Sequence, residues 1–588
     1  MLPTDPREPM DLAARLLRFL EREDVDERRT SDELRALPVG DRVVDGECIE
    51  GAVLLRASRD GVVLRVEENH SKFREGDAIA LGDGLDFANA AAFVYGRWDP
   101  NTLELRLDRD RYARGEEPLL EPGRSYVVDR RPLGLRGRLR DAVRAGLAEP
   151  SIAAVFAGAA PRSRDEARLA RARVALAAAG LDQAQVEAGA LAIATNDLAL
   201  IQGPPGTGKT RMLAEVLRIL VRAGCRIVLS AFTHRAVDNV LFALRRLDPT
   251  VPLFKTGNAG AGAEELRRQQ VRLVQPNRLE LPQDRGAVVA GTPFALERLP
   301  ARVSFHYAVF DEAGQLPIPH AIAGMLLARR WVFVGDHRQL PPVVTAEHGD
   351  EPATRSVFEH LHEHYGATML DRSYRMNDGV CAVIGNAFYD GRLGSAPSAA
   401  SRRMRFVPGG SFDAVLDPDL GVVLARVDHL QPGNRSSEEA ELVGDLVVEC
   451  VRRHGVPTHE ICVIAPFRAQ VRLLRSALER RGITDEALVV DTVERVQGQE
   501  REVVFVSLAA GDPATLDRRA SFFFSPNRLN VALSRARTKA VLVASAGAFA
   551  ALPMDPIGLR AASVYKALAR SLPQVDLSAV YGPRARPR

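Results

Sequence analysis

Cysteine and lysine are both scarce in this sequence, and the few that occur are scattered. The five cysteines form neither a CxxC pair nor a cluster with histidine at the spacing of metal ligands. We therefore expect no disulfide framework, no structural zinc and no iron–sulfur cluster. The basic residues are nearly all arginine, and lysine occurs only at Lys72, Lys209, Lys255, Lys539 and Lys566. We interpret this as a codon bias, against which Lys209 stands out.

Long apolar runs and a strong charge of one sign are also missing. No run approaches the about 18 residues that indicate a membrane span, and the first residues lack a basic segment followed by an apolar one. We therefore expect a cytoplasmic protein with no membrane partner. The net charge is only +3, so an anionic polymer would have to bind in a local groove.

The rest of the composition, 46% hydrophobic and 26% charged, is that of an ordinary globular protein. A chain of 588 residues is too long for one core and should hold roughly three to four domains. We expect six segments with these bounds: an N-terminal helical segment (1–40), an accessory β-barrel (41–130), a helical stalk (131–180), a first α/β domain (181–346), a second α/β domain (347–560) and a C-terminal tail (561–588).

Changes in the spacing of hydrophobic residues along the chain support this division. Leucines at 12, 16, 17 and 20 share one stripe between Asp11 and Glu23, which predicts an amphipathic helix. From about residue 42 to 130, short apolar runs separated by Gly, Asp and Asn indicate a small β-barrel or sandwich. Two Ala/Arg-rich helical stretches follow. After Gly180, strands alternate with helices in two successive series, which predicts an α/β fold with two tandem parallel sheets. We expect the tail to be loose after Ser571.

A phosphate loop begins the first of these series. The sequence GPPGTGKT follows the apolar strand Leu198 to Gln202 and opens the helix Arg211 to Leu220, which is the context this motif requires. Glycines let backbone N–H groups point at phosphate oxygens, while lysine reaches the β- and γ-phosphates and threonine ligates Mg²⁺. A chance glycine-rich turn is the alternative, which this context disfavours. We expect ATP and Mg²⁺ as cofactors, held by Gly203, Pro204, Pro205, Gly206, Thr207, Gly208, Lys209 and Thr210.

Two adjacent acids end a later strand of the same series. Asp311 and Glu312 come directly after the apolar strand Tyr307 to Phe310, at the edge where open parallel sheets bind ligands. Asp311 is placed to hold Mg²⁺, and Glu312 to orient and deprotonate the attacking water. In isolation the two could equally be solvated loop residues; downstream of a phosphate loop we favour the catalytic interpretation.

A series of motifs between Leu181 and Lys539 then resembles a known family. In order along the chain they are LDQAQ, GPPGTGKT, SAFTHRAVDN, AGTP, DEAGQ, GDHRQLPPVV, RSYRMN, APFRAQ, DTVERVQGQE and NRLNVALSRARTK. The series resembles the superfamily 1B helicases, in the branch of the nonsense-mediated-decay helicase, senataxin and the immunoglobulin-mu-binding helicase. The resemblance implies that both sheets are RecA-like.

The resemblance also implies roles around the nucleotide. Gln185 would read the adenine edge, Gln339 would sense the γ-phosphate, and Tyr374 would stack on the base. Arg375 and Arg535 would be arginine fingers, and Gly498 and Glu500 would face the nucleotide. Surface salt bridges are the alternative for the arginines, and core packing is the alternative for the aromatic residues.

A further group of residues is implied to contact nucleic acid. Hydroxyl and backbone groups suit phosphate contacts that carry no sequence information, which predicts salt-sensitive binding of single-stranded DNA, RNA or both. His234 could equally be a structural histidine. The candidates are Thr233, His234, Thr292, Pro341, Phe467 and Thr492.

Two departures from the family pattern stand out. The stretch from Leu247 to Asp284 is short and polar, so any inserted helical subdomain must be small. The acidic and double-arginine lead-in to the last motif is replaced by Ser525-Pro526-Asn527-Arg528, which suggests a prokaryotic side branch and leaves the role of Arg528 open.

Taken together, the motifs predict an ATP-dependent single-strand translocase and helicase, acting as a monomer and moving 5′ to 3′ as that branch does. An ATP-gated clamp that binds nucleic acid without unwinding it is the alternative from another class. A nuclease-helicase would need a carboxylate and lysine cluster, which we do not find in the sequence.

Overall fold

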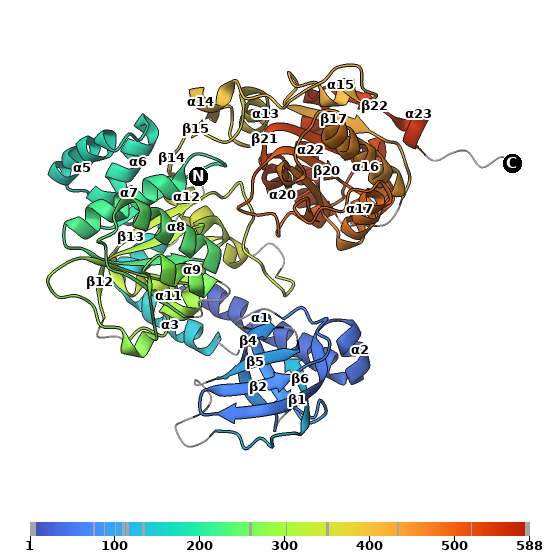
Figure 1. The fold of residues 1–588 in the computed structure, drawn as a ribbon. Helices are drawn as coiled ribbons and strands as arrows, with labels where there is room; N and C mark the ends of the chain where they lie inside the picture. The colour runs from blue at the N-terminus through green and yellow to red at the C-terminus, as the bar shows by residue number, and fades with distance from the viewer. Residues whose placement is uncertain are drawn as a thin grey trace.

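The structure is a computed structural model that describes residues 8–73, 77–87, 89–99, 101–108, 112, 117–131, 136–257, 262–300, 303–348, 352–431, 434–518 and 520–582. Figure 1 shows a small barrel in blue at one end of the molecule, a first α/β unit mainly in green, and a second in orange and red. The last six residues of the predicted tail lie outside the described residues. Within those residues, no helix is long and apolar enough to cross a membrane.

The N-terminal helix α1 spans Glu8–Ala36 and is longer than the predicted stretch from Asp11 to Glu23. Its second half is polar, but oppositely charged neighbours three or four residues apart support the helix. These pairs include Arg28 with Asp24 at 3.1 Å and Arg29 with Asp26 at 2.5 Å. The apolar stripe of the first half is buried, with Leu16 and Leu20 at most 1% exposed. The charges therefore extend a helix that the leucines anchor.

Six antiparallel strands close the barrel in the order β1-β2-β5-β4-β3-β6. Alternate residues point inward, as in the pattern of buried and exposed positions along β5. The sequence left barrel and sandwich open, and the structure is a barrel. The strands are β1 (Cys48–Ser58), β2 (Gly61–Arg65), β3 (Ala78–Gly82), β4 (Ala91–Asp99), β5 (Thr102–Leu107) and β6 (Ser125–Arg130).

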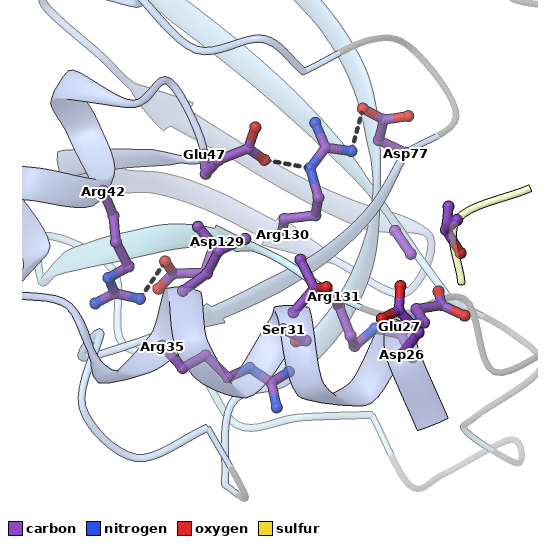
Figure 2. A pocket seen from close by; sticks show the side chains of 14 residues that line it. Asp26, Glu27, Ser31, Arg35, Arg42, Glu47, Asp77, Asp129, Arg130 and Arg131 are labelled. Carbon is purple, nitrogen blue, oxygen red and sulfur yellow. Dashed lines mark hydrogen bonds and ion pairs between the residues drawn. The ribbon is translucent and has the colours of Figure 1, made fainter. Parts of the chain in front are cut away.

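A cavity of about 310 Å³ lies between the barrel and the C-terminal half of α1 (Figure 2). Its charged groups largely neutralise one another. Arg42, in the short helix α2 (Val39–Val44), contacts the buried Asp129 at 2.5 Å. Arg130 contacts Glu47 at 2.6 Å and Asp77 at 3.0 Å. The Arg42 pair fixes α2 against the barrel, and the Arg130 pairs join segments of the barrel itself.

The predicted stalk consists of three helices, α3 (Arg136–Ala148), α4 (Pro150–Phe156) and α5 (Glu166–Ala178). The helix α3 contacts α1 and α11 (Ile318–Met325), whereas α5 packs on α6 (Gln183–Ala194). The stalk helices thus lie against the first α/β unit as well as leading into it.

The first sheet has eight parallel strands in the order β10-β9-β11-β8-β12-β13-β7-β14. One face is covered by α5, α6, α7 (Lys209–Arg222) and α8 (His234–Leu247). The other face is covered by α1, α3, α4, α11 and α12 (Val357–Tyr365). The strands are β7 (Leu198–Gln202), β8 (Arg226–Ala231), β9 (Leu253–Thr256), β10 (Arg272–Val274), β11 (Ala287–Gly291), β12 (Phe305–Asp311), β13 (Ala328–Gly335) and β14 (Thr368–Met369).

One boundary of the first α/β unit differs from the prediction. The first α/β unit continues past residue 346, because Phe358 of α12 is buried in its core and β14 pairs with β7. The short polar stretch after Leu247 contributes β9, the helix α9 (Ala263–Arg268) and β10, which lie at the edge of this sheet.

The second sheet is also parallel, in the order β19-β18-β20-β21-β17-β22. Helices α13 (Asp378–Phe388), α20 (Pro526–Leu533) and α22 (Pro556–Ser571) cover one face. Helices α16 (Ser437–Arg452) and α17 (Arg468–Arg480) cover the other. The strands are β17 (Val422–Arg426), β18 (Ile461–Ala465), β19 (Val489–Thr492), β20 (Arg501–Ser507), β21 (Ala536–Ala544) and β22 (Gln574–Asp576). The chain thus has two tandem RecA-like sheets.

The predicted loose tail is instead part of this second unit as far as Gly582. Tyr565 and Leu568 of α22 are buried in its core, and β22 adds an edge strand beside β17. The short helix α23 (Ser578–Tyr581) follows, and the Tyr581 hydroxyl donates to Asp445 at 2.7 Å. The sequence did not reveal this strand because it is only three residues long.

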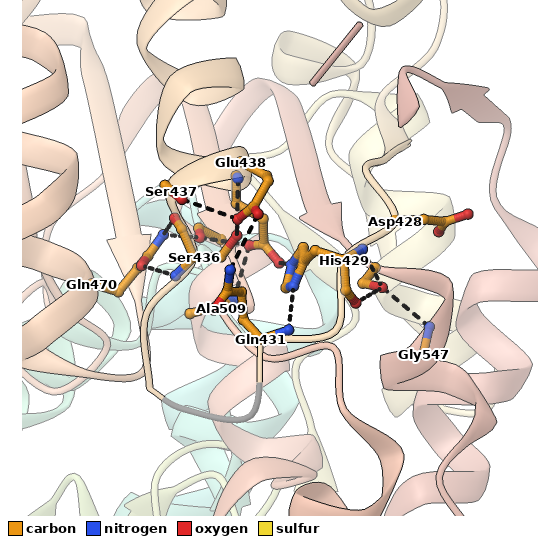
Figure 3. A network of polar contacts seen from close by, with 12 residues as sticks. Asp428, His429, Gln431, Ser436, Ser437, Glu438, Gln470, Ala509 and Gly547 are labelled. Carbon is orange, nitrogen blue, oxygen red and sulfur yellow. Dashed lines mark hydrogen bonds and ion pairs between the residues drawn. The ribbon is translucent and has the colours of Figure 1, made fainter. Parts of the chain in front are cut away.

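A buried polar network joins three strand ends of the second sheet (Figure 3). The fully buried carboxylate of Glu439 accepts from Ser507 at 2.6 Å and lies 2.9 Å from His429. Gln470, from the APFRAQ motif, donates to Ser507 and exchanges two hydrogen bonds with the backbone of Ser436. Every buried polar group here has a partner, so the network stabilises this end of the sheet.

Candidate nucleotide site at the junction of the two sheets

The phosphate loop connects β7 to α7 at the carboxyl edge of the first sheet. Gly206 and Gly208 both have left-handed backbones, with φ of 75° and 73°. This conformation favours glycine and turns backbone N–H groups toward the start of α7, where anions bind. The Lys209 ammonium donates to the carbonyl of Gly203 at 2.5 Å, so it lies folded into the loop. This geometry is compatible with a bound phosphate, and phosphate binding by the loop stays a prediction.

Asp311 ends β12 and is 4% exposed. Burial, followed by the nearby charge of Glu312, raises the pKa of Asp311 above its usual value, while Lys209 opposes the shift. A buried carboxyl group of this kind can bind a divalent cation, because the positive charge of the cation stabilises the carboxylate where water does not reach it. Thr210 lies at the second position of α7 and is partly exposed. The buried carboxyl group of Asp311 thus fits the predicted Mg²⁺ site, and the role of Thr210 in that site stays a prediction.

Glu312 follows Asp311 in a left-handed conformation with φ of 52°, which is rare for a residue with a side chain. The amide of Gln315 lies 3.4 Å from its carboxylate. Such strain at the end of a central strand is typical of a residue that must point in one direction for function. Its geometry supports the predicted role of Glu312 without testing it.

Gln339 lies in the loop after β13, beside the phosphate loop. Its amide donates to Asp336 at 2.8 Å and lies 3.5 Å from the carbonyl of Gly203. Asp336 also accepts from Gln202, the last residue of β7, at 3.2 Å. The candidate γ-phosphate sensor is therefore held next to the loop it would monitor.

The candidates for contact with the adenine base lie beside Gly206 and Thr207 of the phosphate loop. The buried Gln185 donates to the carbonyl of Thr207 at 2.9 Å. The Tyr374 N–H donates to Gly206 at 2.8 Å, and its hydroxyl donates to Asp182 at 2.6 Å. Burial and the Asp182 hydrogen bond raise the pKa of Tyr374 to about 12. Residues far apart in the sequence thus meet at the phosphate loop.

The arginine candidates come from the second half of the chain. Arg375 contacts Glu500 at 2.7 Å and donates to the carbonyl of Ser534 at 3.0 Å. Arg535 is 3% exposed and donates to two backbone carbonyls, those of Val531 at 3.0 Å and Gln499 at 3.1 Å. Burial and then repulsion from Arg375 lower the pKa of Arg535 to about 9. These two cations lie close together, and a phosphate group would supply the negative charge they need.

Two further candidates lie beside these arginines. Burial favours the neutral acid of Glu500, but the charge of Arg375 outweighs it and holds the pKa of Glu500 below its usual value. Gly498 has φ of 76°, and apart from its two chain neighbours none of the described residues has an atom within 4 Å of the position its Cβ would take. Both residues precede β20. The second unit thus contributes the charged Glu500 and the uncrowded backbone of Gly498 to this junction.

The nucleic-acid candidates all lie at or after the carboxyl ends of strands in the two sheets. Thr233, Thr292 and Phe467 precede α8, the short helix α10 (Pro293–Leu296) and α17 as their N-caps. Pro341 lies in the loop after β13, and Thr492 ends β19. In the first sheet this is the edge that carries the phosphate loop, whereas Gly498, Glu500 and Arg535 precede β20 and β21 and so lie at the opposite edge of the second sheet.

Their local chemistry differs from residue to residue. The Thr233 hydroxyl accepts from the N–H of Ala236 at 3.2 Å and so serves as a helix cap. Burial and then the charge of Lys255 lower the pKa of His234 to about 4, so it is neutral at physiological pH. Phe467 packs against the second core. Thr233 thus also caps a helix, and Phe467 also packs in a hydrophobic core.

Several residues at this junction were missed by the sequence reasoning. Ser373 donates to the carbonyl of Pro205 at 3.1 Å. Asn527 donates to the carbonyl of His337 at 2.9 Å and also to that of Gln339. Both lie within motifs of the series, Ser373 directly before Tyr374 and Asn527 at the start of the last motif, so motif membership was the available signal. Arg528, whose role was left open, contacts Glu494 at 2.9 Å.

An AAA-domain family model matches residues 180–407, and another AAA-domain model matches residues 353–547. The chain is similar to the DNA replication ATP-dependent helicase/nuclease JHS1 of Arabidopsis thaliana, with 28% identity over 381 residues that cover 62% of this chain and 28% of that protein. It is equally similar to the DNA replication ATP-dependent helicase/nuclease DNA2 of Xenopus laevis, with 28% identity over 397 residues, covering 62% and 37%.

The chain spans only about a third of the length of these relatives. Among solved structures, the helicase nonstructural protein 10 of an arterivirus gives a TM-score of 0.36 at 13% identity, covering 86% of this chain and 80% of that one. The chain is thus similar to AAA domains and to proteins named as ATP-dependent helicase/nucleases. The branch of the nonsense-mediated-decay helicase and senataxin, and the prokaryotic origin, stay predictions.

Proposed function

We propose that this protein is an ATP-dependent single-strand nucleic-acid translocase and helicase that acts as a monomer. The observation that carries the proposal is the junction at Gly206. Tyr374 donates its N–H to the Gly206 carbonyl at 2.8 Å. The next residue, Arg375, contacts Glu500 of the second unit. A nucleotide held by the phosphate loop would therefore lie between the two sheets.

The residues at this junction suit hydrolysis. Bound ATP and Mg²⁺ would supply the bond to be cleaved and the cation that neutralises charge on its phosphates. Lys209 and the loop N–H groups would hold the phosphates, and Thr210 and Asp311 would hold the cation. Glu312 would orient a water molecule and accept its proton. Arg375 and Arg535 would stabilise the charge that develops on the transferred phosphoryl group.

Division of the site between two sheets would couple hydrolysis to movement. The arginines stabilise this charge only when the cleft is closed, so closure depends on the γ-phosphate and is lost after cleavage. Strand contacts at Thr233, Thr292 and Thr492 would then separate and re-form as the sheets move. A strand bound to both sheets would advance in small steps.

The first test measures ATP hydrolysis with matched single strands of DNA and RNA. We expect at least one of the two to stimulate turnover, and the stimulation should fall as salt rises because phosphate contacts release counterions. Turnover that neither strand changes would overturn the proposal. The ratio between the two strands gives the preference for DNA or RNA, which depends on groove geometry.

Direction of movement is a separate test. We propose 5′ to 3′ polarity from the resemblance of the motif series. Single strands that carry a removable block at one end should lose a 3′ block faster than a 5′ block in the presence of ATP. Faster loss of the 5′ block would reverse the assigned polarity.

A further inference from the structure

The loop after β13 belongs to the first sheet but enters the core of the second unit. Leu340, one residue after the candidate sensor Gln339, is 6% exposed and packs in the core that contains Phe388 and Leu529. Asn527 and Asn530 of α20 donate to backbone carbonyls of this loop, among them Arg338 at 2.7 Å. The loop is therefore attached to both sheets at once.

One side chain lies at the centre of this attachment. Tyr389, which follows α13 in the second unit, donates its hydroxyl to Asp336 at 2.6 Å. The same hydroxyl accepts from the amide of Asn530 at 2.8 Å. All three side chains are buried, with exposed fractions of 1%, 3% and 0% for Tyr389, Asp336 and Asn530. Burial and then the charge of Asp336 raise the pKa of Tyr389 well above its usual value, so the hydroxyl keeps its proton.

Each end of this link leads to a nucleotide candidate. On one side, Asp336 accepts from Gln339 at 2.8 Å and from Gln202 at 3.2 Å, beside the phosphate loop. On the other side, Asn530 lies in α20, which ends directly before Ser534 and Arg535. The Ser534 carbonyl accepts from Arg375 at 3.0 Å. The Tyr389 phenol thus links the sensor to both arginine candidates, beside the direct hydrogen bonds from Asn527 and Asn530 to the loop.

We propose that Tyr389 is a positioning residue whose hydroxyl couples the Gln339 sensor in the first sheet to the Arg375 and Arg535 fingers of the second unit. The inference rests on the proposed function, because it assigns a role within that ATP cycle. Tyr389 does not touch the nucleotide itself. It holds α20 at a fixed distance from Asp336, so that a shift of the sensor loop moves the arginines with it.

Removal of the Tyr389 hydroxyl should break the link between Asp336 and Asn530, while the aromatic ring still fills its place in the core. The side-chain oxygen of Asn530 has no hydrogen-bond partner within the described residues. Without the Tyr389 hydroxyl, the side-chain nitrogen would donate only to the carbonyl of Arg338. Asp336 would keep Gln202 and Gln339. The nucleotide side should therefore stay ordered while the orientation of α20 loosens.

The test compares Tyr389→Phe with Tyr565→Phe in the full chain. Tyr565 is buried in the same core, but its hydroxyl donates only within the second unit, to the carbonyls of Phe523 and Ser525 at 3.2 Å each. Both variants lose one buried hydroxyl and keep the ring. The measurements are ATP turnover at saturating single strand, the KM for ATP, and the number of duplexes separated per ATP hydrolysed.

We expect Tyr389→Phe to lower strand-stimulated kcat about tenfold and to lower the duplexes separated per ATP, with KM for ATP within about twofold of wild type. Tyr565→Phe should retain both the stimulation and the separation ratio. Equal behaviour of the two variants would overturn the coupling role and leave the motor intact. If wild type itself shows no strand-stimulated turnover, the proposed function and this inference both fail.

Discussion

At the residue scale, the account depends on a few side chains around the phosphate loop. Lys209 and Glu312 have different predicted roles, since the first holds phosphate and the second activates water. We expect Lys209→Ala and Glu312→Gln each to lower ATP turnover by about 100-fold or more. Steady-state phosphate release at saturating single strand measures this, and turnover near wild type in either variant would refute the site.

The two variants should differ in binding. Glu312→Gln keeps the size of the side chain and removes only its basicity, so ATP should still bind. Lys209→Ala removes a positive charge from the loop, so its ATP affinity should fall. Titration with a fluorescent, non-hydrolysable ATP analogue distinguishes the two cases.

Arg535 gives the sharpest residue-level test of the second sheet. Its guanidinium is buried and donates to backbone carbonyls of its own unit. We expect Arg535→Ala to keep ATP binding but to lower turnover by about 1000-fold, as for an arginine finger. Lost binding combined with normal turnover at saturation would contradict this role. A matched control is Arg528→Ala, because Arg528 contacts Glu494 and lies on α20, the helix that ends just before Ser534 and Arg535.

Gly206 tests whether the two halves are in contact. A Cβ at this position would lie 2.5 Å from the Arg375 Cβ and 2.6 Å from the Ser373 hydroxyl. We expect Gly206→Ala to separate Arg375 from the loop, raising the KM for ATP and lowering turnover. Gly224→Ala is the control, because φ of 82° gives it similar strain but no atom lies within 4 Å of its Cβ.

Both glycine variants should lose about 1–2 kcal/mol of stability from the left-handed backbone alone. Chemical denaturation measures that loss. If the two variants have the same KM and turnover, the contact between the halves does not matter for catalysis.

At the element scale, α1 is attached to the loop that follows the sensor motif. The Glu23 carboxylate accepts from the N–H groups of Thr345 at 3.1 Å and Ala346 at 2.9 Å, and lies 2.7 Å from His348. The N-terminal helix thus reaches the loop that begins at Asp336. It also borders the barrel, so it connects the barrel with the first α/β unit.

We expect Glu23→Gln to lower the free energy of unfolding by about 1–3 kcal/mol, because the amide removes the charge and replaces one of the two oxygens that accept from these donors. Burial opposes the charge of Glu23, but hydrogen bonds from His348, Ala346 and Thr345 hold its pKa below the usual value. Its contribution is therefore present at neutral pH and is lost as pH falls through the lowered pKa. Denaturant titrations at neutral and acidic pH measure both effects.

Glu33→Gln is the matched control for this prediction. Glu33 lies on the same helix but is exposed, and it contacts Arg29 only at 3.9 Å. This substitution should change stability by less than about 0.5 kcal/mol. Equal losses in both variants would mean that α1 is not held through Glu23.

Across the whole molecule, the sequence predicted the order of the parts better than their edges. Alternating apolar strands and helices were visible because buried parallel strands are nearly all apolar. The strands β14 and β22 were invisible because two or three residues carry no period. Phe358 and Tyr565 bring α12 and α22 into cores that their own sequences do not identify.

The candidate site follows the same rule. Motifs named the residues that would face ligands, such as Lys209 and Gln185, because their spacing along the chain carries the signal. They did not show that Tyr389 bridges Asp336 and Asn530, since this link joins three separate segments. Only the packing of one sheet against the other places them together.

The central claim is that hydrolysis at this junction moves a strand. The most direct measurement follows separation of a labelled duplex with a single-stranded tail, with ATP turnover recorded in the same reaction. The account predicts separation that requires hydrolysable ATP in wild type and is lost in Lys209→Ala. Turnover stimulated by the tail without any separation would contradict the helicase claim and favour an ATP-gated clamp.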